Sequence, residues 1–535
     1  MTDEARYGKP SAESPNPARG SPGLARVILV FVLDGLRPDA INPVDTPTLF
    51  RLRQEGVYYL NSHAVFPTVT RVNAAAIGTG AYPGTNGIVS NVMYVPEVNR
   101  GQPFNLGDYQ HLVSLEAVSG GQLMLVKTLG EQLQEHALQL AVVSSGSTGS
   151  SLLLNPHARR GVGSLVNGYF EPGRLVAFPS AVNQAVLERF GPAPAKGGTS
   201  EPHRAAVDWT EDVLREFVLP ELRPDVVINW LTEPDHMQHA FGAGSPESRQ
   251  MLRNNDRHIG RILGTLQTLG LAERVDILVV SDHGFSRVTF AVNVIQALIE
   301  AGLKAAPDSD DMVVASSDQA VLLHVRDHAP ERIQQVVRWL QSQEWTGVIF
   351  TRGVGATNAR EPSTSPAPQG WVDGTFSLEL IHLANDARGP DILFTFPWTS
   401  ATNRFGLAGT DLVHSTRAPG PCNGDASSHG SMSPWTIRNT CLAWGVDFKR
   451  GVAVRVPAGN VDLVPTIVAL KGLSADTSYD GRVLQEALLG GPDEEQVPIE
   501  TRILTTQTDG GHYQAAIQIS TVEQQRYIDK SWRVR

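Results

Sequence analysis

The sequence predicts an α/β fold in which helices flank a mostly parallel central sheet. Four short runs rich in β-branched residues recur along the chain, and each is almost wholly apolar: residues 27–33, 140–143, 226–231 and 275–280. Strands that helices cover on both faces have this composition. Stretches typical of helices lie between the runs: residues 128–139, the segment after Asp208, and residues 248–270, which end at a glycine. Such alternation indicates α/β architecture.

Three further regions depart from this alternation. Residues 292–303, 319–327 and 330–343 mix helical and strand patterns and predict a small α+β insert. The Pro- and Ser-rich residues 360–370 indicate an exposed loop. Residues 502–534 predict strands around an Asp-Gly-Gly turn, which would add an antiparallel β extension. Residues 1–24 hold several Pro, Gly and Ser and no apolar run, so we expect a flexible tail.

Composition restricts the class of protein and its partners. The 535 residues carry 44 Lys plus Arg against 55 Asp plus Glu, a formal net charge of −11, which argues against a nucleic-acid polymer as partner. Hydrophobic residues make up 41% and charged residues 19%, as in a globular protein. With two cysteines, Cys422 and Cys441, the chain offers no disulfide scaffold, and whether these two interact stays open.

The sequence shows neither a signal peptide nor a membrane-spanning segment. The apolar run that begins near residue 25 lacks a small-residue cleavage site and ends in an acidic residue and a glycine. No window reaches the length of roughly 20 apolar residues that spans a bilayer. We therefore expect a cytoplasmic protein without a membrane partner.

Acidic residues and histidines follow three of the predicted strands. Asp34 ends the first run, Asp235 and His239 follow the third, and Asp282 and His283 follow the fourth. In an open α/β sheet, ligands bind beyond the carboxyl ends of the strands. Taken singly, such an Asp is more often a helix cap and such a His a solvated side chain. Three clusters in one chain favour a site for a divalent metal with oxygen and imidazole ligands.

Two further segments could contribute to the same site. Thr68 or Thr70 could cap the helix of small residues that follows, or either hydroxyl could lie in the positive field of that helix terminus, where a phosphoryl oxygen is stabilised. His429 lies in a loop rich in Gly and Ser, whose small residues permit close approach to a metal.

In this order, the five motifs resemble those of the type I phosphodiesterase/nucleotide pyrophosphatase branch of the alkaline phosphatase superfamily. The resemblance extends from residue 34 to about residue 472. It implies an alkaline phosphatase-like catalytic domain over residues 25–484, with the insert around 286–425 and the β extension at 485–535. It implies two zinc ions, although other divalent transition metals would suit such ligands. One ion would be bound by Asp34, Thr70, Asp282 and His283, and the other by Asp235, His239 and His429.

The same resemblance implies a hydrolase that cleaves phosphodiester or pyrophosphate bonds through a phosphothreonine intermediate. Thr70 would be the nucleophile, and Asn73 the amide that holds a phosphoryl oxygen. Two Zn²⁺ ions and three carboxylates would leave the site with a net positive charge, so it would attract a small anionic phosphoester or phosphonate. Arg71 follows Thr70 where the family usually has Phe. Its guanidinium could bind a second phosphate or a carboxylate, which favours a small anionic substrate over a stacked base.

Other functions are consistent with parts of the sequence. A phosphonoacetate-type hydrolase or a phosphomonoesterase would use the same site. A sulfatase would need a Cys or Ser converted to formylglycine, and both cysteines lie far from Thr70. A metal-stabilised binding protein without catalysis is disfavoured by the complete set of ligands and nucleophile. The absence of a GxxxxGK[ST] motif excludes a P-loop enzyme. The physiological substrate, the native metal and the oligomeric state stay open.

Overall fold

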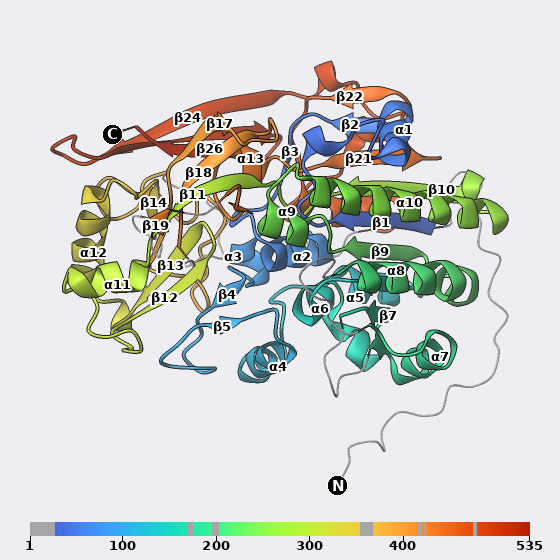
Figure 1. The fold of residues 1–535 in the computed structure, drawn as a ribbon, viewed down its shortest axis with the longest axis horizontal. Coiled ribbons are helices and arrows are strands. Elements are labelled where there is room, and N and C mark those ends of the chain that lie inside the picture. Colours follow the sequence, from blue (N-terminus) through green and yellow to red (C-terminus); the bar gives the residue numbers. More distant parts are fainter. Residues whose placement is uncertain are drawn as a thin grey trace, which may run out of the picture.

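The central sheet has nine strands, and its middle is parallel. The computed structural model describes residues 27–169, 176–194, 203–353, 368–415, 420–421, 424–474 and 479–534. The strand order is β22-β2-β21-β10-β1-β9-β6-β7-β8 (Figure 1). The parallel block consists of β10 (Val275–Val280), β1 (Val27–Leu33), β9 (Val226–Leu231), β6 (Leu140–Ser144) and β7 (Ser164–Asn167). Its neighbours are β8 (Ala177–Phe178), β21 (Cys441–Gly445), β2 (Val57–Tyr59) and β22 (Val452–Val454).

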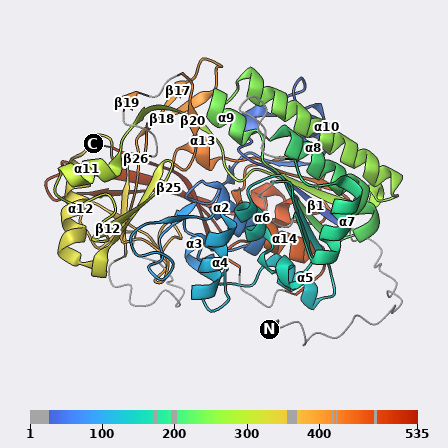
Figure 2. The same ribbon diagram turned by 60° about the horizontal axis from the view of Figure 1, so that its bottom comes forward.

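The four apolar runs are confirmed as strands of this block. Three of them coincide with β1, β9 and β10, and the fourth lies within β6. Alternate residues of β1 are buried in two different cores, with Leu29 in one and Val30 in the other. Helices α8 (Arg204–Val213) and α10 (Pro246–Thr268) lie on one side of β1, and α14 (Leu463–Leu470) lies on the other (Figure 2). Burial on both faces explains why these strands are wholly apolar.

The predicted helices exist with shifted ends. Residues 128–139 form the shorter α5 (Leu129–Glu135), since Ala137 has a φ of 57°, in the left-handed region. The helix expected over 248–270 is α10, which begins earlier because Ser245 caps it by accepting a hydrogen bond from the Ser248 N–H. The segment after Asp208 continues α8 into a π-helix, η3 (Leu214–Leu222).

The insert is α+β, as predicted. Its five-stranded sheet has the order β12-β13-β16-β14-β15, with helices α11 (Val294–Glu300) and α12 (Pro330–Ser342) beside it at the left of Figure 1. The strands are β12 (Met312–Ser317), β13 (Ala320–Val325), β14 (Ile349–Thr351), β15 (Phe376–Ser377) and β16 (Ile392–Thr395). A second small sheet contains β11 (Ser286–Ala291), β17 (Trp398–Thr402), β18 (Ala408–His414), β19 (Gly420–Pro421) and β20 (Ser427–Ser428).

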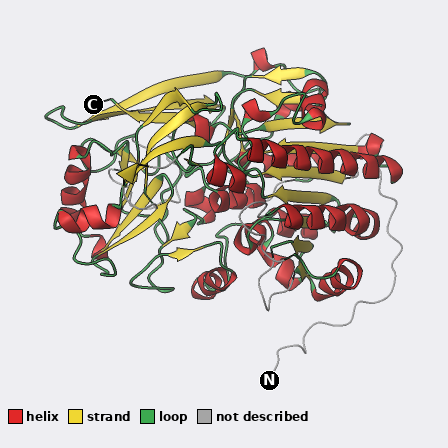
Figure 3. Ribbon diagram, in the orientation of Figure 1, coloured by secondary structure: helices red, strands yellow, loops and turns green. Residues whose placement is uncertain are grey.

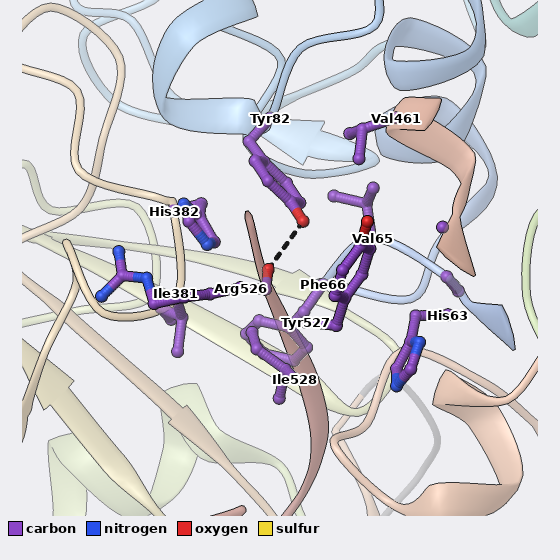
Figure 4. A pocket seen from close by; sticks show the side chains of 12 residues that line it. His63, Val65, Phe66, Tyr82, Ile381, His382, Val461, Arg526, Tyr527 and Ile528 are labelled. Atoms are coloured by element: carbon purple, nitrogen blue, oxygen red, sulfur yellow. Dashed lines mark hydrogen bonds between the residues drawn. The ribbon is translucent and has the colours of Figure 1, made fainter. Parts of the chain in front are cut away.

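The C-terminal strands form a separate antiparallel layer, visible along the upper edge of Figure 3. They are β24 (Ile499–Gln507), β25 (Gln514–Val522) and β26 (Gln525–Arg533). This layer is fixed to the catalytic core by buried polar contacts. His63 Nε2 lies 2.9 Å from Asp529 Oδ1, and the Tyr527 hydroxyl donates to Asp462 Oδ2 at 2.9 Å. The Tyr82 hydroxyl donates to the carbonyl of Arg526 beside a cavity of about 10 Å³ (Figure 4). That volume holds at most one water molecule.

The remaining elements connect these layers. They are α1 (Pro47–Glu55), α2 (Thr70–Thr79), α3 (Pro83–Asn86), α4 (Tyr109–Val118), α6 (Thr148–Leu154), α7 (Ser180–Phe190), α9 (Asp235–Phe241), α13 (Pro434–Ile437), β3 (Ser62–His63), β4 (Val92–Met93), β5 (Phe104–Asn105) and β23 (Ala458–Gly459). Short helices are η1 (Pro38–Ala40), η2 (Pro156–Arg160), η4 (Ala272–Arg274), η5 (Arg326–His328), η6 (Asn460–Asp462), η7 (Gln485–Ala487) and η8 (Glu494–Gln496).

Some predictions fall beyond the part of the chain that the structure covers. The tail at 1–24, residues 360–367 of the expected exposed loop, and Cys422 lie outside the described residues. The proposed domain boundaries stay a prediction. Within the described ranges, none of the helices combines the length and the apolar character that crossing a membrane requires.

Candidate functional site

The predicted metal ligands converge at the carboxyl ends of β1, β9 and β10. Asp34 follows β1 directly, α9 begins at Asp235 four residues after β9, and Asp282 lies two residues after β10. The ligand atoms form two groups, and within each group all of them lie within 4.8 Å of one another. One group contains Asp34, Asp235 and His283, and the other contains Asp235, His239 and His429. The structure therefore brings the separate sequence motifs to one place.

Asp282 and Thr70 extend the first group through contacts with the His283 imidazole. Its Nε2 lies 3.1 Å from Asp282 Oδ2, 3.5 Å from Asp34 Oδ1 and 3.4 Å from the Thr70 hydroxyl. These are the four residues that the family resemblance assigns to one ion.

The second group centres on Asp235. Its Oδ1 lies 3.5 Å from His239 Nε2 and 3.4 Å from His429 Nε2. The His429 ring also stacks on that of His283, with the ring centroids 3.6 Å apart, so the two groups are adjacent. This is the set that the sequence assigned to the other ion, and Asp235 lies between the two groups.

The hydrogen bonds of the three histidines fix how their rings face the site. His283 Nδ1 lies 3.0 Å from the carbonyl of Gly284, His239 Nδ1 lies 3.1 Å from that of Ser427, and His429 Nδ1 lies 2.9 Å from that of Thr68. A carbonyl can only accept, so each Nδ1 carries the hydrogen. Each neutral ring then presents the lone pair of Nε2 to the centre of the site, which is the tautomer that a metal needs.

Each of the three carboxylates has one buried oxygen without a hydrogen bond in the described part of the chain. Asp34 Oδ2 accepts from the Trp230 indole at 3.1 Å, and Asp282 Oδ1 accepts from the Gly35 N–H at 3.0 Å. The other oxygens, Asp34 Oδ1, Asp282 Oδ2 and also Asp235 Oδ1, are buried and accept no hydrogen bond from the described residues. A buried carboxylate oxygen without a partner is costly, and a cation would satisfy it.

The electrostatics of the three carboxylates also favour a bound cation. Burial raises the pKa of Asp34 well above its usual range, and the nearby charges of Asp282 and Asp235 raise it further. Burial likewise raises the pKa of Asp235. Without a counter-charge, three carboxylates this close cannot all ionise, whereas divalent cations reverse that balance. The residues therefore fit a pair of divalent metal ions.

Thr70 presents its hydroxyl to the site instead of capping a helix. It is the first residue of α2, whose N-cap residue is Val69, and no side chain caps that helix. The neighbouring Thr68 hydroxyl donates to the carbonyl of Ser431 at 2.9 Å and accepts from the Gly430 N–H at 3.0 Å. Thr68 thus ties the His429 loop to the start of α2, and of the two threonines it is Thr70 whose hydroxyl lies at the ligands.

The expected role of Asn73 is corrected by its contacts. Its Nδ2 donates to the carbonyls of Val65 and Val69, at 3.0 and 3.1 Å, and its Oδ1 accepts from the Val65 N–H at 2.7 Å. The side chain is fully buried. Because its amide is already bonded to the backbone that precedes Thr70, Asn73 is not placed to hold a phosphoryl oxygen.

Asn91 is an amide near Thr70 that sequence reasoning missed. Its Oδ1 accepts from the backbone N–H of Arg71 at 2.8 Å, while its Nδ2 meets no acceptor among the described residues. The only signal in the sequence is a polar residue at the end of a short apolar run, which many loops share.

A chain of buried asparagine amides joins α2 to the loop of Asp282, and no sequence pattern indicates it. Asn460 Nδ2 donates to Asn73 Oδ1 at 2.9 Å and to the carbonyl of Asp282 at 3.1 Å. Asn439 Nδ2 donates to Asn460 Oδ1 at 3.0 Å. This amide chain holds α2 and the Asp282 loop at a fixed separation.

The α/β fold is alkaline phosphatase-like, and two solved structures share it. Murine ectonucleotide pyrophosphatase/phosphodiesterase 5 superposes with a TM-score of 0.57 at 15% identity, covering 86% of this chain and all of the murine chain. Its inactive threonine-to-alanine variant in complex with AMP superposes with a TM-score of 0.55 at 16% identity, covering 86% of this chain and 99% of the other. At such identities the likeness shows the fold alone.

The chain belongs to the type I phosphodiesterase/nucleotide pyrophosphatase family, whose family model matches residues 28–351. Mouse ectonucleotide pyrophosphatase/phosphodiesterase family member 1 is 26% identical over 261 residues, which is 48% of this chain and 24% of the mouse protein. Human family member 7 is 25% identical over 283 residues, 52% of this chain and 51% of the human protein. The matches thus span about a quarter to a half of the length of these relatives.

Proposed function

We propose that this protein is a hydrolase that cleaves phosphodiester or pyrophosphate bonds through a phosphothreonine on Thr70, at a site that holds two Zn²⁺ ions. The observation that carries this proposal is the convergence of the buried Thr70 hydroxyl with two adjacent groups of ligand atoms. Relatives named as phosphodiesterases and nucleotide pyrophosphatases support the reaction class, and the inactive threonine-to-alanine variant of the murine relative supports a threonine nucleophile.

Seven residues would hold the metals. One ion would be bound by Asp34, Thr70, Asp282 and His283, and the other by Asp235, His239 and His429. When bound, the metals supply Lewis-acid stabilisation of phosphoryl oxygens and lower the pKa of hydroxyl groups. Iron or manganese would also suit these ligands.

The chain's own residues would carry out the rest of the chemistry. The Thr70 hydroxyl gives its proton to solvent and its oxygen attacks phosphorus in line; the bond to the leaving oxygen breaks as the new bond forms, and the leaving oxygen takes a proton from solvent. Water then attacks the phosphothreonine from the opposite side and restores the hydroxyl, so configuration at phosphorus is retained. The Asn91 Nδ2 amide takes the role first expected of Asn73 and donates to a non-bridging oxygen, a contact worth about 3 kcal/mol.

The substrate is a small anionic phosphoester. The local charge of a metal-loaded site is positive although the protein is acidic overall, so a compact anion is attracted while a long nucleic acid is not. The same residues would also serve a phosphomonoesterase or a phosphonoacetate-type hydrolase. Zinc-loaded and chelated protein assayed with bis(p-nitrophenyl) phosphate, p-nitrophenyl phosphate and phosphonoacetate separates these functions.

The nucleophile is tested by Thr70→Ala, with Thr70→Ser as the matched control. Thr70→Ala should lose turnover and keep two equivalents of zinc, while Thr70→Ser keeps a hydroxyl and should retain part of the rate. Quenched reactions of the wild type should contain phosphothreonine. A wild-type rate in Thr70→Ala would remove this nucleophile from the proposal.

A further inference from the structure

A second cluster of polar side chains lies beside the metal ligands and contains none of them. Arg71 follows Thr70 in α2, Ser147 precedes α6, Tyr169 follows β7, His203 precedes α8, and His236 follows Asp235 in α9. These residues come from five separate segments of the chain, and each is at least partly buried. We call them the Arg71 cluster.

The Arg71 guanidinium donates one side-chain hydrogen bond within the described part of the chain. Its Nη2 donates to the Ser147 hydroxyl at 3.2 Å. Gly107 permits this position, because a Cβ atom there would lie 2.8 Å from the same nitrogen. The buried Nε donates to no acceptor in the described part of the chain. A guanidinium has five N–H donors in a planar fork, and Ser147 is the only described residue whose side chain accepts from it.

Three aromatic rings stack next to Asp235, because His236 follows Asp235 in α9. The rings of His236 and His203 lie with their centroids 3.6 Å apart, and His203 stacks on Tyr169 at 6.2 Å with an angle of 10° between the planes. His236 is anchored through Nδ1, which lies 3.3 Å from the Thr232 hydroxyl. Tyr169 and His236 both interact electrostatically with Arg71, so the stack lies near the guanidinium.

The guanidinium adjoins the metal site because Arg71 directly follows Thr70 in α2. The carboxylates of Asp34 and Asp235 attract it. Asp318, at the turn between β12 and β13, also attracts it. Bound metals would neutralise the carboxylates of Asp34 and Asp235. The positive charge of the Arg71 guanidinium would then be available to attract an anionic substrate.

We propose, resting on the proposed function, that Arg71 and Ser147 form an anion subsite bounded by the His236–His203–Tyr169 stack. It binds a carboxylate or phosphate that the substrate carries on a short arm beyond the reacting phosphorus. The planar fork suits the two oxygens of such a group, which can accept paired hydrogen bonds. The preferred substrates are therefore small diesters or pyrophosphates with a second anionic terminus.

The test uses p-nitrophenyl phosphodiesters whose second ester arm has two carbons and ends in a carboxylate, a phosphonate or a neutral carboxamide. A fourth ester carries thymidine. On zinc-loaded wild type, kcat/KM for each anionic ester should exceed that for the carboxamide by about 10- to 100-fold, the usual effect of a hydrogen bond to a charged group. In Arg71→Gln the ratio should fall to about 1. Arg332→Gln, at a half-buried arginine of α12, is the matched control and should keep the wild-type ratio.

Three outcomes would overturn the subsite: a ratio near 1 in the wild type, a ratio unchanged in Arg71→Gln, or a preference for the thymidine ester that Arg71→Gln leaves intact. Absence of metal-dependent turnover with all four esters would refute the proposed function instead. Calorimetry then decides the subsite by itself. Zinc-loaded protein should bind 3-phosphonopropanoate at least 10-fold more tightly than 3-phosphonopropanamide, and equal affinities would overturn it.

Discussion

Replacing Asn460 should lower kcat, although Asn460 is neither the proposed nucleophile nor a proposed metal ligand. Its buried Nδ2 reaches Asn73 Oδ1 at 2.9 Å, the carbonyl of Asp282 at 3.1 Å and the carbonyl of Ser281 at 3.2 Å. It thereby connects the helix of the proposed nucleophile to the loop of two proposed metal ligands. Asn460→Ala removes these hydrogen bonds together with the one from Asn439.

The size of the effect follows from the hydrogen bonds that the substitution removes. A net hydrogen bond contributes about 1 kcal/mol, and a buried group left without a partner costs about 1–3 kcal/mol. Several of the acceptors keep other partners, so Asn460→Ala should lower the free energy of unfolding by about 2–4 kcal/mol. If α2 and the Asp282 loop then shift by a fraction of an ångström, kcat should fall by about 10- to 100-fold with KM little changed.

The assay combines urea unfolding, zinc content and steady-state kinetics on a phosphodiester. Asn183→Ala is the matched control, because the buried Asn183 accepts from the N–H groups of Val176 and Ala177 in a region away from the site. It should lose stability and keep kcat. Asn460→Asp keeps the shape and loses the donors, so it should resemble Asn460→Ala. A wild-type kcat in a folded, zinc-loaded Asn460→Ala protein would refute the positioning role.

Further predictions concern metal binding, pH and the C-terminal layer. His429→Ala should lower the zinc content from two equivalents towards one, because only Asp235 and His239 of the second group would remain. Native mass spectrometry measures this content. The control His157→Ala, on η2, should keep two equivalents of zinc. Burial raises the pKa of Asp276 to about 8, so the contribution of its protonated form to stability is present at low pH and is lost as pH rises through that value. In urea unfolding between pH 5 and 8, the wild type should therefore lose up to about 1.4 kcal/mol of unfolding free energy per pH unit relative to Asp276→Asn. Parallel pH profiles of the two proteins would contradict this. Asp529→Asn weakens the contact with His63 and should lower the melting temperature by about 1–3 °C, while Asp509→Asn, in the exposed turn, should not.

Composition and local pattern are enough to locate the strands of the central sheet and the polar residues that follow them. A strand covered on both faces must be apolar throughout, so residues 226–231 and 275–280 could be identified from composition alone. A polar residue that directly follows such a strand has little choice of position, because the chain must leave the sheet at its carboxyl edge. For that reason Asp34, Asp235 and Asp282 could be expected to meet before the fold was known.

The contacts of the buried amides and of the Arg71 guanidinium become visible only in the folded chain. The family resemblance assigned the phosphoryl contact to Asn73, yet that side chain bonds to the backbone of Val65 and Val69, and a further partner, Asn460, lies 387 positions along the chain. Asn91 and Ser147 reach Arg71 from loops whose course no local pattern records. An amide or a guanidinium can point in many directions from one backbone position. Which direction it takes depends on distant segments that fold against it, and sequence periodicity does not encode those contacts.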